Sequence, residues 1–139
     1  MINARQIAPP ADTLDPRTYE RAIKTALGIA ETAGLQEMRS YVRSWKKKPA
    51  FRIERKGDES AVVTNDEVFG YQDRGTKRHV IRPRSKRFLR FTPKGGGTVF
   101  AKKVNHPGTP AQRFSERAAA AVQKQFQRVM AEELRKAAP

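Results

Sequence analysis

Residues 15–47, DPRTYERAIKTALGIAETAGLQEMRSYVRSWKK, carry the pattern that decides the expected fold. The Asp15 carboxylate can accept hydrogen bonds from the first free N–H groups of a helix, and Pro16 at the first helical position loses no bond. Apolar side chains then recur every three or four residues, which places them on one stripe of a helix. The sequence predicts a single long helix that ends near Lys47, because Pro49 pushes the residue before it out of the helical region.

The stretch that follows, up to residue 104, has the pattern of short strands. Phe51 and Ile53 alternate with charged residues, and residues 61–64 return as the second strand of a hairpin. Further strands are expected at residues 80–81, 87–92 and 98–104, with a loop through Gly70 and Gly75 before them and a turn over residues 93–97. These segments predict an antiparallel sheet of four or five short strands.

A second helix is expected at the end of the chain. Its apolar residues step by four and form one stripe: Phe114, Ala118, Val122, Phe126, Met130 and Leu134. This stripe should pack on the sheet or on the first helix. The order helix, strands, helix predicts the α+β class, as a single domain over residues 15–137. Residues 1–14 contain two consecutive prolines and few apolar residues, so we expect a flexible arm there.

The positive charge of the chain is concentrated in its middle. The 139 residues include 29 Lys and Arg and 14 Asp and Glu, a net charge of +15, and residues 39–103 alone carry +13. Such a surplus repels itself unless an acidic partner offsets it. Basic residues beside Phe51, Phe88 and Phe91 suit a phosphate-lined partner. The candidate contacts with DNA or another acidic partner are Lys46, Lys47, Lys48, Arg78, Arg82, Arg84, Lys86 and Arg87.

No catalytic, metal or cofactor site is expected. The absence of Cys removes thiolate chemistry and Cys-ligated metals, and His79 and His106 alone make a poor metal site. The spacing of Gly70 and Gly75 is close to that of the phosphate-binding motif in which Lys and then Ser or Thr follow the second glycine. Here Thr76 precedes Lys77, and a strand is expected where the motif needs a helix. There is no run of about 18 apolar residues and no secretory pattern at the amino terminus. We therefore expect a protein that is not an enzyme, not membrane-spanning and not exported.

Motifs in the second half of the chain resemble a known family. They are Tyr71 with Asp73, Gly75-Thr76, HVIRP at 79–83, FLRF at 88–91, VFAKKVNHPG at 99–108, and a helix that opens near Phe114. In this order they resemble the neck, or tail-completion, proteins of long-tailed bacteriophages. The resemblance extends over residues 15–137 in the order of elements.

The resemblance implies a structural protein of the virion at the head–tail junction. Such a protein is made in the cytoplasm of the host bacterium and forms an oligomeric ring, commonly six-fold, around the DNA channel. Its partners would be other copies, other neck and tail proteins, and the packaged DNA. The matched residues should serve loop geometry and core anchoring: Tyr71, Gly75, Thr76, His106, Pro107, Gly108 and Phe114. The alternative is a free-standing basic protein that binds nucleic acid.

Overall fold

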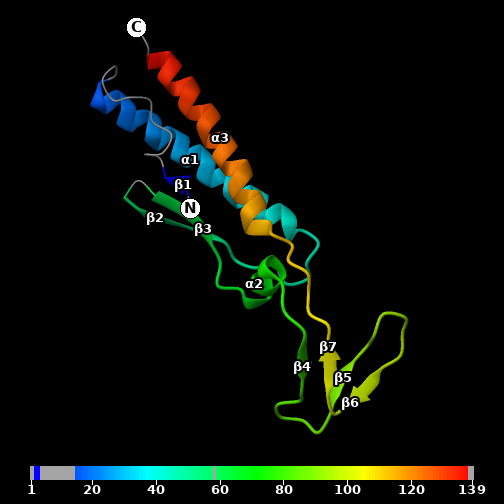
Figure 1. Ribbon diagram of the computed structural model, residues 1–139. Helices are drawn as coiled ribbons and strands as arrows, with labels where there is room; N and C mark the ends of the chain where they lie inside the picture. Colours follow the sequence, from blue (N-terminus) through cyan, green and yellow to red (C-terminus); the bar gives the residue numbers. More distant parts are fainter. Residues whose placement is uncertain (1, 4–14, 58, 138–139) are drawn as a thin grey trace. The chain divides into compact units, whose positions relative to one another are not determined.

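The computed structural model describes residues 2–3, 15–57 and 59–137, and it confirms the predicted α+β class (Figure 1). The helices are α1 (Pro16–Tyr41), α2 (Glu67–Arg74) and α3 (Phe114–Ala137). The strands are β1 (Ile2–Asn3), β2 (Arg52–Lys56), β3 (Glu59–Val63), β4 (His79–Ile81), β5 (Leu89–Phe91), β6 (Val99–Ala101) and β7 (Val104–His106). Apart from β1, the expected arm over residues 1–14 lies outside the described residues.

The chain divides into two compact units, where the sequence suggested one domain. Residues 1–69 and 113–139 form the first, which we call the core unit. Residues 70–112 form the second, which we call the strand unit. The strand unit is therefore an insertion between two parts of the core unit.

Helix α1 begins as predicted and ends earlier than predicted. The Asp15 carboxylate accepts from the backbone N–H of Thr18 at 3.3 Å, and Pro16 takes the first helical position. The predicted end near Lys47 was wrong, since the helix stops at Tyr41. The chain turns there, and Trp45 packs on Phe69 with the ring centroids 6.4 Å apart. Tertiary packing thus ends the helix before Pro49 can.

The core unit is held first by the pairing of α1 with α3. Figure 1 shows the two helices side by side. Ala22, Ala26 and Ala30 of α1 are buried, and their small side chains allow a close approach of α3. Phe126 and Met130 of α3 fill that contact and are fully buried. The predicted apolar stripes of both helices therefore pack against each other. Of the two alternatives that the sequence allowed for the last helix, packing on the sheet or on the first helix, the structure has the second.

A second cluster in the core unit is built around Phe69. Its ring stacks on Phe114 at 5.6 Å and meets Phe51 edge-on at 5.3 Å. Phe69 lies on α2, where the sequence was expected to form a loop. That expectation was wrong, because Asp66 caps a helix there and accepts from the backbone N–H of Phe69 at 2.8 Å. Burial of Phe69 then stabilises the short helix.

The predicted hairpin of the core unit is confirmed. Strands β2 and β3 pair antiparallel with Arg52 opposite Val63, and β1 adds to the other edge of β3. Gly34 brings α1 close to this sheet and to α3. A Cβ at Gly34 would lie 3.1 Å from Val122 Cγ2 and 3.3 Å from Val62 Cγ2. The small residue thus permits the tight packing of helix, helix and strand.

The strand unit contains two separate antiparallel ribbons where one sheet was expected. Strand β4 pairs with β7, and β5 pairs with β6. The prediction of a single strand over residues 98–104 was wrong. This segment contains β6 and the start of β7, and the two strands pair with different partners. The strand unit is consequently a pair of two-stranded ribbons, each with open edges.

Candidate interaction surface

A clasp formed by Gly75, Thr76, Gly108 and Thr109 ties the two ends of the strand unit together. Thr76 and Thr109 form an isolated antiparallel bridge, with N–H to carbonyl distances of 2.9 and 3.1 Å. Both glycines have positive φ, 74° at Gly75 and 93° at Gly108. A Cβ at Gly75 would lie 2.6 Å from the carbonyl oxygen of Thr109. Only glycine fits such an approach without a shift of the backbone, so the two glycines permit the close contact of these loops.

The two histidines lie directly opposite each other next to the clasp. His79 of β4 faces His106 of β7, and the rings stack with centroids 5.0 Å apart. Nδ1 of His79 lies 2.8 Å from the carbonyl oxygen of Lys77, and Nδ1 of His106 accepts from the N–H of Gly108 at 3.0 Å. The described residues hold no cluster of His, Cys, Asp or Glu suited to a metal ion. The stacked rings add a side-chain contact to the pairing of β4 with β7.

The other matched residues occupy different surroundings. Phe114 packs in the core unit, where its ring stacks on Tyr41 at 5.1 Å. Tyr71 is 52% exposed, and Pro107 is exposed as well. Five of the seven matched residues thus make structural contacts, while Tyr71 and Pro107 leave their side chains accessible.

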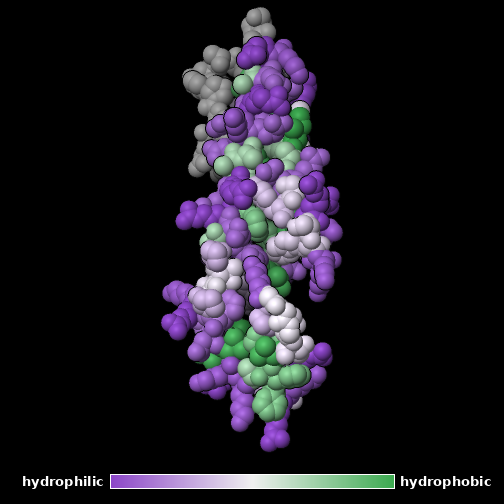
Figure 2. Space-filling view, turned by 90° about the vertical axis from the view of Figure 1, so that its right-hand side faces the viewer, coloured by the Kyte–Doolittle hydropathy of each residue, from purple (hydrophilic) through white to green (hydrophobic). Residues whose placement is uncertain are grey.

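No residue of the strand unit is buried, although its strands carry large apolar side chains. Those exposed in the strands are Val80, Ile81, Phe91, Val99 and Phe100, and Phe88, just before β5, is exposed as well. In the lower part of Figure 2, apolar surface (green) is accordingly visible among hydrophilic residues (purple). A two-stranded ribbon is marginally stable by itself, since it has no core to bury. In proteins, contiguous exposed apolar surface is typical of interaction sites.

The strand unit is also strongly basic. It holds eleven Lys and Arg and one carboxylate, Asp73, so its formal charge is +10. Arg78, Arg82, Arg84, Lys86 and Arg87 of the predicted set lie here, and all are exposed. Lys46, Lys47 and Lys48 lie in the core unit after α1 and are exposed too. Across the described residues, none of these eight side chains has an ion pair or a hydrogen bond.

The aromatic residues predicted beside these cations divide between the two units. Phe51 packs against Phe69 in the core unit, so its assignment to a partner surface was wrong. Phe88 and Phe91 are exposed, as a partner contact requires. The sequence analysis missed Phe100, which is 65% exposed and lies opposite Arg90. Phe100 lies within the strand expected at residues 98–104, where its large apolar side chain was the available signal.

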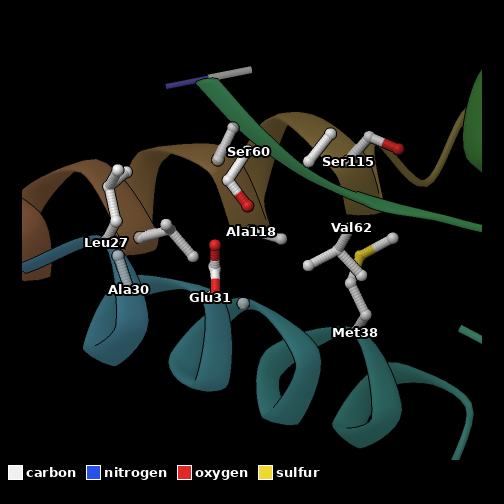
Figure 3. Close-up of a pocket in the computed structure, with 12 residues that line it drawn as sticks. Leu27, Ala30, Glu31, Met38, Ser60, Val62, Ser115 and Ala118 are labelled. Carbon is white, nitrogen blue, oxygen red and sulfur yellow. The ribbon is translucent and has the colours of Figure 1, made fainter. Parts of the chain in front are cut away.

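A cavity of about 170 Å³ lies in the core unit between α1, β3 and α3 (Figure 3). Its walls are mostly apolar, and Glu31 and Ser60 point toward each other inside it. The Glu31 side chain is 5% exposed, and its Oε1 accepts from Nε of Arg55 at 2.6 Å. A second bond joins Glu31 to the same guanidinium. Because Arg55 neutralises the carboxylate, the cavity offers no free charge to a ligand.

The ion pair between Glu31 and Arg55 makes stability depend on pH. The Arg55 guanidinium holds the pKa of Glu31 below its ordinary value, against the opposing effect of burial. A carboxyl group whose pKa is lowered by folding stabilises the protein above its unfolded pKa. That contribution disappears as the pH falls through the folded pKa.

Replacement of Arg55 by Met should therefore destabilise the core unit more at pH 7 than at pH 3. At neutral pH the variant leaves a buried carboxylate without its partner, whereas at pH 3 the carboxyl of the variant, which has lost the guanidinium that lowered its pKa, takes up a proton. Urea unfolding at the two pH values measures the difference in midpoint. Arg52→Met is the matched control, since Arg52 pairs with the exposed Glu54 and should change the midpoint little at either pH. An equal shift at both pH values would contradict this account.

Comparisons with protein-family models, with curated proteins and with solved structures found no match to this chain. The described helices include none with the length and apolar character needed to cross a membrane.

Proposed function

We propose that this protein is a structural subunit of the head–tail junction of a long-tailed bacteriophage. In this proposal it is a neck or tail-completion subunit that assembles as a ring around the DNA channel. It is made in the bacterial cytoplasm and works in the virion, in contact with copies of itself and with neighbouring neck and tail proteins. No catalytic step is part of this role.

One observation carries the proposal: the strand unit has no buried residue, yet its ribbons carry uncovered apolar side chains. A subunit that is complete by itself would bury them, because exposed apolar area costs about 25 cal/mol per Å². A subunit that meets its neighbours in a ring covers them on assembly. The clasp supports the same role, since it holds the matched motif residues in a fixed geometry at the ends of this surface.

The functional test is loss of the gene from the phage that encodes the chain. We expect DNA-filled heads and finished tails to accumulate without joining, and infectivity to fall by orders of magnitude. A copy of the gene supplied in trans should restore joined particles, which controls for effects on neighbouring genes. Electron microscopy of the lysate distinguishes the outcomes. Intact, infectious virions in the absence of the protein would refute the proposed function.

The free-standing nucleic-acid-binding protein remains the second candidate. The observation in its favour is the charge of +10 on the strand unit, which suits any nucleic acid. It differs from the first candidate in needing no assembly. A chain that binds DNA while it stays monomeric at all concentrations would support it.

A further inference from the structure

The ribbon of β5 and β6 has two chemically different faces. Side chains alternate along a strand, and residues directly opposite in an antiparallel pair share a face. Leu89 lies opposite Ala101 and Phe91 opposite Val99, so one face is apolar. On the other face Arg90 lies opposite Phe100. One ribbon can therefore contact a protein neighbour on the first face while it presents a cation and an aromatic ring on the second.

The connection between β4 and β5 adds a dense group of cations. Within six residues it carries Arg82, Arg84, Lys86 and Arg87, which we call the basic loop. All four side chains are exposed, and none makes an ion pair or a hydrogen bond among the described residues. Four like charges this close repel each other at low salt, because no carboxylate lies between them to offset the field. Such a group of cations attracts an anion of high charge density.

We propose that the basic loop binds the phosphate backbone of double-stranded DNA without reading its sequence. The inference deepens the proposed function and rests on it for the choice of the double-stranded form, since a ring around the channel surrounds the leaving genome. Lys and Arg neutralise phosphates and release the counterions condensed on the duplex. Arg90 and Phe100 extend the contact along the second face of the ribbon.

The charge of the basic loop favours DNA over another copy of the chain as its partner. A second copy of the chain carries +15 overall, so association of copies adds net positive charge around the basic loop. The apolar face suits another copy, whereas the basic loop needs a polyanion. Duplex DNA carries one negative charge per about 1.7 Å of helix axis, which matches four cations within six residues better than scattered carboxylates do.

The test is a salt titration of the full chain against a 30-base-pair duplex of random sequence, measured by fluorescence anisotropy. The variant replaces Arg82, Arg84, Lys86 and Arg87 by Gln. Each phosphate contact contributes about 0.9 to the slope of log affinity against log salt concentration. The loss of four contacts should therefore make this slope shallower by about 3 to 4 units. The control replaces Lys124, Arg128, Arg135 and Lys136 of α3 by Gln, which removes the same net charge. It should leave the slope within about one unit of the parent.

Two further probes separate DNA from other anions. A single strand of equal length tests whether the duplex is preferred, and polyglutamate tests an acidic polypeptide. We expect the tightest binding with the duplex. Tighter binding of polyglutamate, no binding of the duplex near physiological salt, or equal slopes for the two fourfold variants would overturn the inference.

Sedimentation of the same variants keeps this inference separate from the proposed function. The basic-loop variant should assemble like the parent, because the apolar face of the ribbon is unchanged. Assembly without DNA binding would overturn only the inference. DNA binding by a chain that does not assemble would support the inference and would contradict the proposed ring.

Discussion

Replacement of Gly108 by Val should disorder the strand unit while the core unit stays folded. A Cβ at this position would lie 3.0 Å from the carbonyl carbon of Lys77 and closer still to the carbonyl oxygen of Thr76. The φ of 93° adds strain for a β-branched residue, of roughly 1 to 3 kcal/mol. The bridge between Thr76 and Thr109 cannot then form in its present geometry. Besides this bridge, the ends are joined by the N–H of Gln112, which donates to the carbonyl oxygen of Gln72 at 2.9 Å, and by the short pairing of β4 with β7. These few bonds have little packing behind them, because the unit buries no residue of its own.

Limited proteolysis with trypsin measures this effect, because the strand unit is rich in Lys and Arg. We expect cleavage between residues 77 and 103 to become at least tenfold faster in Gly108→Val, with the thermal unfolding of the core unit nearly unchanged. Gly96→Val is the matched control. Gly96 has a φ of 94°, almost that of Gly108, but no atom within 4 Å of its Cβ position. Equal acceleration in both variants would show that close packing at the clasp is unimportant.

Replacement of both Phe91 and Val99 by Asp should abolish self-assembly. The two residues are opposite each other on the apolar face of the β5–β6 ribbon and are 37% and 40% exposed. In the isolated chain the two carboxylates repel each other across the ribbon, but neither replaced side chain belongs to the core unit, whose stability should not change. In an assembled ring two carboxylates would be desolvated against a neighbour, at several kcal/mol for each that finds no partner.

Sedimentation velocity over a range of concentrations measures the loss of assembly. We expect the parent to form closed oligomers and the double variant to stay monomeric. The control is Ile29→Asp on α1, a residue that is 41% exposed in the core unit. It should retain assembly. Oligomers of the double variant with unchanged stability would contradict the assignment of this face.

Local signals in the sequence were sufficient for several elements. Asp15 with Pro16 fixed the start of α1, because the cap needs only groups within one turn. The stripe from Phe114 onwards predicted α3, and the alternation around Ile53 predicted the hairpin. In each case the information lies within a few residues of the element. Tertiary contacts then agreed with the local preference.

The errors arose where a distant partner decides the structure. Burial of Val42 and the packing of Trp45 end α1 early, and neither contact can be predicted from the neighbouring sequence. The division between β6 and β7 depends on which strand each one pairs with, and alternation cannot reveal that choice. The short helix α2 had a usable signal, since Asp66 and Glu67 form an N-terminal cap pattern before Phe69.

The candidate site was predictable in its composition but not in its geometry. The cations of the basic loop could be counted in the sequence, and their exposure followed from their charge. The sequence could not show that Gly75 and Gly108 meet, because 33 residues separate them. Nor could it show that Phe51 packs on the core while Phe100 is exposed, since each lies in a short predicted strand and the strand pattern does not say which face is covered.

The most direct test of the account is amide hydrogen exchange of the strand unit at increasing protein concentration. We expect the amides of β4 to β7 to exchange rapidly in the dilute chain and to become protected as copies associate, because neighbours then cover the ribbons. The amides of α1 and α3 should be protected throughout. Exchange in the strand unit that stays the same at every concentration, whether slow or fast, would contradict the claim that assembly completes this surface.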